Sequence, residues 1–232
     1  MIDGRSGDAS RYRDAAVISS LCSQYGTDGL IILGSSSSMS CDFGMEFFNP
    51  DGTSGMMCGN GGRCVVAFAS DLGMIGDRCR FLAPDGEHSA SISAETVRLS
   101  MRKTSDPVGL LGGWFVDTGA RHFVKFVDDL ESVDVETLGK ELRFAPEFSP
   151  EGVNVDFVQR MADGSISVRT FEKGVERETL ACGTGVTAAA IVSLELYSGI
   201  PNPVTVHARE ADLTVERDGD SVFLTGPARR VL

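Results

Sequence analysis

Two short cysteine-bearing segments are the residues of this chain best suited to chemistry. Cys58 is followed by Gly-Asn-Gly and Cys182 by Gly-Thr-Gly, and each leads into an apolar run with helical spacing. A cysteine at the start of a helix lies beside unpaired backbone N–H groups and the positive end of the helix dipole. This position predicts a lowered thiol pKa, and therefore thiolate character near neutral pH, at both cysteines. The glycines leave the N–H groups open to a bound carboxylate.

The repetition of this turn predicts a two-base reaction. A single glycine-rich helix start is more often only a tight turn, but two with cysteine in the same place are hard to explain by packing. Two thiols that face one small anionic substrate can invert a carbon centre. One thiolate removes the α-proton from one face, and the opposite thiol returns a proton to the other face. The helix N-termini hold the carboxylate and stabilise the developing charge, so the reaction needs no pyridoxal phosphate.

The elements that must position these turns occur in the same order in each half of the chain. Helical spacing or alternation predicts, in the first half, a helix over 10–25, strands at 29–33 and 45–48, a helix at about 61–72 and a hairpin of 89–93 with 96–101. In the second half it predicts strands at 114–117 and 122–127, a helix at 134–143, a hairpin of 153–159 with 165–171, a long helix after the second cysteine and three final strands. We therefore predict an α+β fold with two structurally similar halves, 1–108 and 109–232. Each half is a curved, mainly antiparallel sheet around a central helix, and the active site lies in the cleft between them. Residues 104–113 are the predicted linker between the halves. The prediction also permits the last strand of the chain to belong to the first half.

Composition excludes several classes of protein. The chain has 232 residues and a net charge of −12, which argues against partners such as nucleic acid and anionic membranes because both require clustered cations. No run approaches the ~18 apolar residues of a membrane helix, and no signal peptide is recognisable, so we expect a cytoplasmic protein.

In that compartment the six cysteines are predicted to be free thiols. There is no Cys-x-x-Cys pair and the three histidines are far apart, so no metal site is predicted. Four further cysteines are predicted to be small buried residues: Cys22, Cys41, Cys64 and Cys79.

Two segments carry a specific resemblance. FFNPDGTSGMMCGNGGRC (47–64) and FEKGVERETLACGTGVTAAA (171–190) closely resemble the two signature regions of diaminopimelate epimerase, a cofactor-independent family. Its members interconvert LL- and meso-diaminopimelate in the synthesis of lysine and peptidoglycan precursors. The resemblance extends over nearly the whole chain, including VNVDFVQ (153–159) and LTGPA (224–228). The related proline racemases typically carry His after the first Cys-Gly, whereas Asn60 stands here and favours the diaminopimelate branch.

The resemblance implies roles for the residues of the two turns. Cys58 and Cys182 match the two proton-transfer thiols, of which the first deprotonates the LL isomer and the second works in the reverse direction. The backbone donors that hold the reacting carboxylate match Gly59, Asn60, Gly183 and Thr184.

It also implies roles for residues outside the turns. Asn49 and Asn154 match asparagines that read the distal end of the amino acid, and Glu172 matches the glutamate at the reacting amino group. His122 matches a histidine close to the catalytic cysteines. By residue type alone, His122 is more often an ordinary half-buried histidine, and Glu172 and Asn154 are more often surface or turn residues. The expected partner is thus a small amino-acid substrate, and since family members often dimerise we also expect a homodimer.

Three departures from the family concern substrate binding. The family opens with a strand and an HGxGNDF loop, and this chain begins at MIDGR, past that loop, so we expect one strand and one substrate contact to be missing. Ala120 and Arg121 stand where the family has Asn and Pro before the histidine. Lys173 stands where the family has an arginine after the catalytic glutamate. Lysine keeps the positive charge but cannot make the bidentate hydrogen bonds of a guanidinium to a carboxylate.

Three other functions stay open from the sequence. A racemase or epimerase of the proline or hydroxyproline type would use the same thiol pair on a smaller substrate. A homologue with impaired catalysis would bind an amino acid without turning it over. A redox protein that uses the two cysteines as a dithiol is the third, but it leaves the glycine-rich anion cradle without a purpose.

Overall fold

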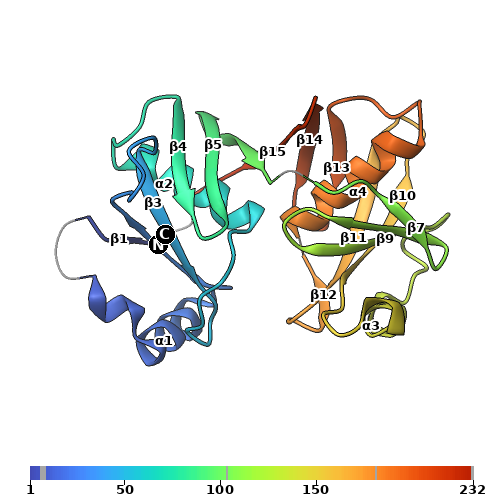
Figure 1. The fold of residues 1–232 in the computed structure, drawn as a ribbon, viewed down its shortest axis with the longest axis horizontal. Coiled ribbons are helices and arrows are strands. Elements are labelled where there is room, and N and C mark those ends of the chain that lie inside the picture. Colours follow the sequence, from blue (N-terminus) through green and yellow to red (C-terminus); the bar gives the residue numbers. More distant parts are fainter. Residues whose placement is uncertain (6–8, 103, 181, 231–232) are drawn as a thin grey trace. The chain divides into compact units, whose positions relative to one another are not determined.

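The protein folds as two compact α+β units. The structure, a computed structural model, describes all residues except 6–8, 103, 181 and 231–232 (Figure 1). The first unit comprises Met1–Leu99 together with residues 228–230, and the second comprises Ser100–Pro227. This division falls before the predicted boundary at 108/109. After the last strand the backbone N–H of Ala228 donates to the carbonyl of Glu95, so the chain returns to the first unit.

In the first unit a sheet is combined with two α-helices. Its elements are β1 (Ile2–Asp3), η1 (Ser10–Arg13), α1 (Ala15–Tyr25), β2 (Leu30–Gly34), β3 (Phe43–Phe48), α2 (Gly59–Asp71), β4 (Arg78–Ala83), β5 (Gly86–Ser93) and β6 (Thr96–Met101). The strands pair in chain order, antiparallel except for β1 with β2 and β3 with β4. Helix α2 contacts both β2 and β5, so the sheet curves around it.

The second unit repeats this plan on a larger scale. Its elements are β7 (Val108–Leu110), β8 (Gly113–Asp117), β9 (Arg121–Phe126), α3 (Val135–Arg143), η2 (Pro146–Phe148), β10 (Asn154–Arg160), β11 (Ile166–Glu172), β12 (Arg177–Thr179), α4 (Gly183–Leu196), β13 (Val204–His207), β14 (Asp212–Asp218) and β15 (Ser221–Pro227). The sheet order is β7-β8-β9-β10-β11-β13-β14-β15, with β12 paired to β11.

The two units share one supersecondary arrangement around the cysteine-bearing turns. In each, a strand that precedes the turn pairs in parallel with the first strand after the helix: β3 with β4, and β11 with β13, where the short β12 lies between β11 and the turn. A parallel pair requires a crossover, and α2 or α4 provides it. An antiparallel three-stranded meander then follows each helix. The predicted fold class of similar halves, each with a mainly antiparallel sheet around a central helix, is confirmed.

Helix α4 is central to its unit because it is apolar on all sides. Its residues from Gly183 to Ser193 are buried except Thr184, and it contacts β8, β9, β10, β11, β13 and β14. The hydroxyls of Thr187 and Ser193 donate to backbone carbonyls one turn earlier, so no hydroxyl on this buried helix lacks a partner. A helix of this kind must be enclosed by the sheet.

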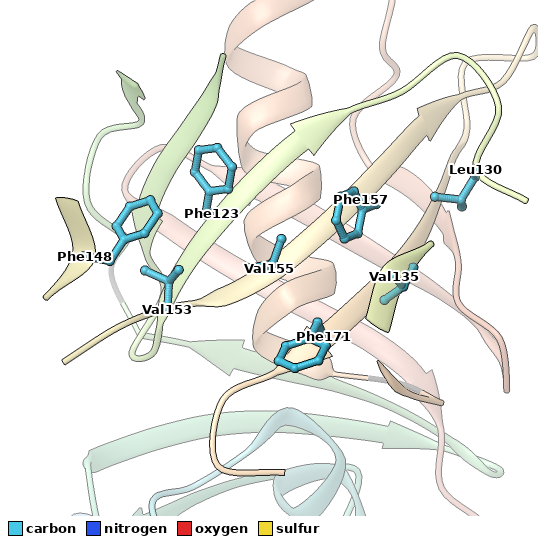
Figure 2. Close-up of a cluster of buried hydrophobic side chains, with 8 residues drawn as sticks. All are labelled: Phe123, Leu130, Val135, Phe148, Val153, Val155, Phe157 and Phe171. Carbon is cyan, nitrogen blue, oxygen red and sulfur yellow. The ribbon is translucent and has the colours of Figure 1, made fainter. Parts of the chain in front are cut away.

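A second core lies on the other face of the strands that cover α4. It is an aromatic and aliphatic cluster, shown in Figure 2: Phe123, Leu130, Val135, Phe148, Val153, Val155, Phe157 and Phe171. Side chains alternate across a strand, so the intervening residues of β10, Asn154 and Asp156, point to the α4 face. Strand β10 is therefore buried on both faces, with polar groups on one of them.

Most of the predicted elements are confirmed, with one error and one partial success. The stretch 104–113 predicted as a linker contains β7, which pairs with β8 across a turn at Leu111 and Gly112. The predicted helix over 10–25 is divided into η1 and α1, and within α1 Ile18 and Cys22 are buried but Tyr25 is 55% exposed. Among the described residues, no helix has both the length and the apolar content needed to cross a membrane.

Gly139 of α3 provides a test of the packing between this helix and the sheet. A Cβ at Gly139 would lie 2.5 Å from the Cβ of Phe171, so α3 would have to shift. Alanine favours helix by about 1 kcal/mol over glycine, but overpacking a core costs about 1–3 kcal/mol. We expect Gly139→Ala to lower the free energy of unfolding by about 1 kcal/mol, measured by urea titration.

The neighbouring Lys140 is exposed on the same helix and serves as the control. Lys140→Ala should change the free energy of unfolding by no more than about 0.5 kcal/mol. Stabilisation by Gly139→Ala would contradict the described contact of α3 with Phe171.

Candidate active site

Cys58 is the N-cap residue of α2, as predicted. Its carbonyl accepts the first helical hydrogen bond, from Gly62 N, and its Sγ accepts the N–H of Gly61 at 3.2 Å. The side chain is half-buried. The thiol therefore lies against a backbone donor at the positive end of a helix, an arrangement that favours its thiolate form.

Arg63 adds a positive charge beside this turn. It is 6% exposed, and its guanidinium donates to the carbonyl of Gly59 at 3.2 Å and to Asn60 Oδ1 at 2.9 Å. Burial lowers the pKa of Arg63, and the negative charges of the Cys64 and Cys58 thiolates oppose that shift. Arg63 was not predicted as a site residue, although a charged residue in an otherwise apolar helical run is the signal that could have found it.

Asn49 lies in the loop that follows β3, half-buried. Its Nδ2 donates to Thr53 Oγ1 at 3.0 Å, and its backbone N–H donates to the carbonyl of Thr53 at 2.9 Å. These bonds fix the loop and leave the amide oxygen of Asn49 available to a ligand.

Cys182 is the N-cap residue of α4 and, like Cys58, has an extended backbone conformation. Its carbonyl accepts from Val186 N, and its φ of −113° equals that of Cys58, whereas its ψ is 108° against 155° at Cys58. The side chains differ. Cys182 is only 9% exposed, and its Sγ lies 3.4 Å from Thr184 Oγ1.

The expected lowering of the thiol pKa is wrong for Cys182. Burial raises the pKa of Cys182, and the negative charges of Glu172 and Asp156 raise it further. The hydroxyl of Thr184 and the N–H of Gly185 favour the thiolate but are outweighed. The position of a cysteine in the sequence places it at a helix N-terminus, but its burial and its charged neighbours come from the fold. Cys182 is therefore held as a thiol.

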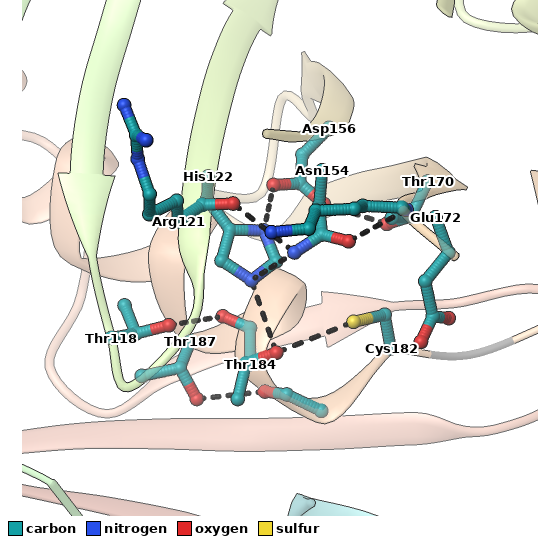
Figure 3. Close-up of polar contacts among 12 residues, drawn as sticks. Thr118, Arg121, His122, Asn154, Asp156, Thr170, Glu172, Cys182, Thr184 and Thr187 are labelled. Atoms are coloured by element: carbon teal, nitrogen blue, oxygen red, sulfur yellow. Dashed lines mark hydrogen bonds and ion pairs between the residues drawn. The ribbon is translucent and has the colours of Figure 1, made fainter. Parts of the chain in front are cut away.

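Behind Cys182 a chain of hydrogen bonds runs into the core of the second unit (Figure 3). Thr184 Oγ1 lies 3.0 Å from His122 Nε2, and His122 Nδ1 lies 2.7 Å from Asp156 Oδ2. The side chains of His122 and Asp156 are completely buried. Thr170 donates its hydroxyl to the other carboxylate oxygen of Asp156 at 2.7 Å.

Asn154 is tied into the same network. Its Oδ1 accepts the backbone N–H of Lys173 at 2.9 Å, and its Nδ2 donates to the carbonyl of Arg121 at 3.1 Å. The same Nδ2 lies 3.4 Å from His122 Nε2. The side chain of Lys173 is exposed, whereas that of Arg121 pairs with Glu151 at 2.6 Å.

Glu172 is near enough to Cys182 for its charge to act on the thiol. It is half-buried at the end of β11, and its Oε2 accepts the hydroxyl of Thr179 at 2.9 Å. A carboxylate in this position can bind an ammonium group next to Cys182.

The glycines of the two turns also have packing roles. A Cβ at Gly185 would overlap Oδ1 of Asp156, so glycine is needed for the carboxylate to approach α4. A Cβ at Gly62 would lie 2.6 Å from a methyl group of Leu99. The close approach therefore serves the protein core as well as any ligand.

The structure thus brings together many of the predicted residues within each unit. Cys58, Gly59 and Asn60 form one group, and Cys182, Gly183, Thr184, His122, Asn154 and Glu172 form another. Sequence reasoning missed Asp156 and Thr170. The signal that could have found Asp156 is a charged residue at an alternating position in the mostly apolar run VNVDFV.

All six cysteines are free thiols. Cys22 and Cys79 are buried as predicted, but Cys41 and Cys64 are only half-buried.

The family model and the relatives found by sequence agree on one family. The family model described as diaminopimelate epimerase matches residues 114–231. A diaminopimelate epimerase from Aquifex aeolicus (strain VF5) is 42% identical over 219 residues, which cover 89% of this chain and 78% of that protein. The diaminopimelate epimerase of Chlorobaculum tepidum is 42% identical over 217 residues, or 89% of this chain and 84% of that protein. A Bacillus anthracis phenazine biosynthesis protein of the PhzF family has the same fold, with a TM-score of 0.70 at 13% identity and coverage of 97% of this chain and 88% of that chain.

The raised pKa of Cys182 predicts a loss of stability at alkaline pH. The folded protein keeps this thiol protonated at a pH where the unfolded chain, with an ordinary thiol pKa of about 8.5, releases the proton. The stabilisation is complete below about pH 8.5 and is lost as the pH rises towards the raised value. We compare the free energy of unfolding of the parent with that of Cys182→Ser. Between about pH 8 and about pH 10 the difference between them should fall by about 2 kcal/mol. Urea titrations in the presence of a reductant measure this difference, and a constant difference would contradict a buried thiol.

Proposed function

Since the chain belongs to the diaminopimelate epimerase family, we propose that it interconverts LL- and meso-diaminopimelate without a cofactor: one thiolate removes the α-proton, and the opposite thiol gives its own proton to the other face of the carbon. The enzyme is thus an isomerase. In the cell the product would serve lysine and peptidoglycan precursor synthesis, as it does for the family.

The observation that supports this mechanism is the pair of matched N-caps. Cys58 and Cys182 each occupy the last residue before a helix, with the same backbone bond to the fourth residue on. Each turn places the first backbone N–H groups of a helix beside its cysteine, from Gly59 and Asn60 or from Gly183 and Thr184. Such donors bind a carboxylate and stabilise the negative charge that develops when the α-proton leaves.

The environments of the two thiols support opposite starting states. Cys58 accepts a backbone N–H and lies near the charge of Arg63, so it is suited to begin as the thiolate that takes the proton from the LL isomer. Cys182 is buried beside two carboxylates and is suited to begin as the thiol that returns a proton. In the reverse direction the two states are exchanged. Glu172 would hold the substrate ammonium next to Cys182.

The replacement of either thiol tests the mechanism. Each direction needs one base and one acid, so Cys58→Ala and Cys182→Ala should each lower kcat in both directions by roughly 10²- to 10⁴-fold. The matched control is Cys64→Ala, which changes a half-buried cysteine inside α2 that has no role in the proposed reaction. The measurement is epimerisation of LL- and of meso-diaminopimelate, with α-deuterium incorporation in deuterated water.

The same deuterium experiment separates the other candidate functions. A proline-type racemase would label proline or hydroxyproline in preference to diaminopimelate, and a binding homologue would label neither. A dithiol redox protein, which cycles between two thiols and a disulfide, would likewise label neither amino acid. Near-parental epimerisation by Cys182→Ala would end the two-thiol proposal.

Ala120 and Lys173 provide a test of substrate binding at the distal end. Neither side chain offers the planar contacts of the family's Asn and Arg, and a hydrogen bond to a charged group is worth about 1.5–3 kcal/mol. The double variant Ala120→Asn with Lys173→Arg should therefore raise kcat/KM for LL-diaminopimelate about tenfold. Lys140→Arg, an exposed exchange on α3, controls for the change of cation and should have no effect. A fall in kcat/KM would show that the present residues already fit the distal carboxylate.

A further inference from the structure

Asp156 enters the proposed reaction only as a charge near Cys182, yet it is a completely buried acid that hydrogen bonds connect to that thiol. The connection runs through His122 and Thr184, with successive separations of 2.7, 3.0 and 3.4 Å. Burial of a carboxylate is unfavourable unless hydrogen bonds compensate for it. Two bonds do so here, from Thr170 and His122.

The chemistry of these groups fixes the direction of each bond. A carboxylate only accepts, so the proton between Asp156 and His122 belongs to Nδ1 of the imidazole. In a neutral imidazole the other nitrogen, Nε2, then carries a lone pair and accepts. The hydroxyl of Thr184 can donate to it.

Thr184 has a single hydroxyl hydrogen, which it must share between two acceptors. While Cys182 is a thiol, its S–H donates to Thr184 Oγ1, and the hydroxyl donates to His122 Nε2. When Cys182 gives its proton to the substrate carbon, the electron pair stays on sulfur. The thiolate then needs a donor, and Thr184 can turn its hydrogen from Nε2 to sulfur. Asn154 Nδ2, 3.4 Å from Nε2, is positioned to replace it there.

We propose that Asp156 is a positioning residue for the epimerase reaction: it holds His122 in the Nδ1–H tautomer, so that the hydroxyl of Thr184 can alternate between His122 and Cys182. This proposal rests on the two-thiol function above. With the opposite tautomer, Nε2–H would donate to Thr184 Oγ1, and the hydroxyl hydrogen could no longer alternate between His122 and the sulfur. While Cys182 is a thiol, S–H and Nε2–H would both donate to Thr184 Oγ1, and the hydroxyl hydrogen would have no acceptor in this network. Only the Nδ1–H form serves both protonation states, which a reversible enzyme requires.

The surroundings of Asp156 preserve this geometry. Thr170 on β11 holds one carboxylate oxygen, and the absence of a side chain at Gly185 leaves room for the carboxylate against α4. Parallel pairing of β9 with β10 places His122 beside Asn154, two residues from Asp156. Each member of the chain is thus held by a regular element.

Nuclear magnetic resonance of histidine labelled with ¹⁵N reads the tautomer directly. The chain has only three histidines, and a His122→Gln sample assigns the signal. We expect the parent to show His122 as a neutral Nδ1–H imidazole and Asp156→Asn to populate the Nε2–H form. An imidazolium or an Nε2–H tautomer in the parent overturns the proposal.

Kinetics of Asp156→Asn test the consequence. Asparagine keeps the volume but removes the charge, and kcat should fall about tenfold or more while KM changes much less. The control is Thr170→Val, which removes a hydroxyl from the same carboxylate and leaves its charge; its His122 signal should match the parent. A parental kcat in Asp156→Asn overturns the proposal.

Thr184 provides a second test that does not depend on the folding of the Asp156 variant. Thr184→Val removes the hydroxyl at nearly constant volume, and Thr184→Ser restores it. The serine variant should exceed the valine variant in kcat by about tenfold. Thr187→Val, a turn later on α4, removes a buried hydroxyl that lies outside the chain and should be near parental. Equal kcat in the serine and valine variants overturns the proposal.

The two proposals fail in different ways. If the parent does not epimerise diaminopimelate, the proposed function is wrong. If it does, and the tautomer or the Asp156 and Thr184 variants behave otherwise than expected, only the positioning role is wrong.

Discussion

The burial of α4 from Gly183 to Ser193, except at Thr184, is the constraint on which the second unit depends. A helix without a polar face along this stretch needs a sheet that bends around it, and six strands contact α4. Burial of this stretch also buries most of the first turn, where the positive end of the helix dipole and the first N–H groups lie. Cys182 is therefore removed from water together with the turn that holds it. The same packing that positions the thiol raises its pKa, so fold stability and thiol chemistry cannot be adjusted independently here.

The two cysteine turns have similar backbone positions but different electrostatics. Near Cys58 the buried cation of Arg63, one turn into the helix, donates to the carbonyl of Gly59. At Cys182 the neighbouring charges are the carboxylates of Glu172 and Asp156. A symmetrical pair of equally acidic thiols would share one proton without preference. Opposite charges around the two thiols instead favour different resting states, which is the asymmetry that the proposed one-base, one-acid step requires.

The sequence predicted the order of elements because strand alternation and helical spacing are local signals. The helix after each cysteine and the hairpin across residues 161–165 follow from such signals. The segment 104–113 was misread since β7 is a short edge strand whose pairing with β8 is a tertiary contact. The pKa of Cys182 was mispredicted for a related reason. Local spacing in the sequence predicts that Cys182 lies at a helix N-terminus, but the desolvation of its thiol depends on strands far away in the chain. Asp156 was missed because a resemblance to known motifs directs attention to the motif residues and away from what lies behind them.

The third residue of each Cys-Gly-x-Gly turn connects the thiol to its electrostatic environment. Asn60 accepts from the guanidinium of Arg63, whereas Thr184 joins Cys182 to the imidazole of His122. The glycines on either side are constrained by backbone geometry and close packing, so this position is free to differ between the turns. An amide that binds a cation favours a negative thiolate nearby, and a hydroxyl that both donates and accepts suits a thiol that loses and regains its proton in the proposed reaction. Two copies of one turn thus acquire different acid–base surroundings through one side chain each, although both cysteines are N-caps with an extended backbone.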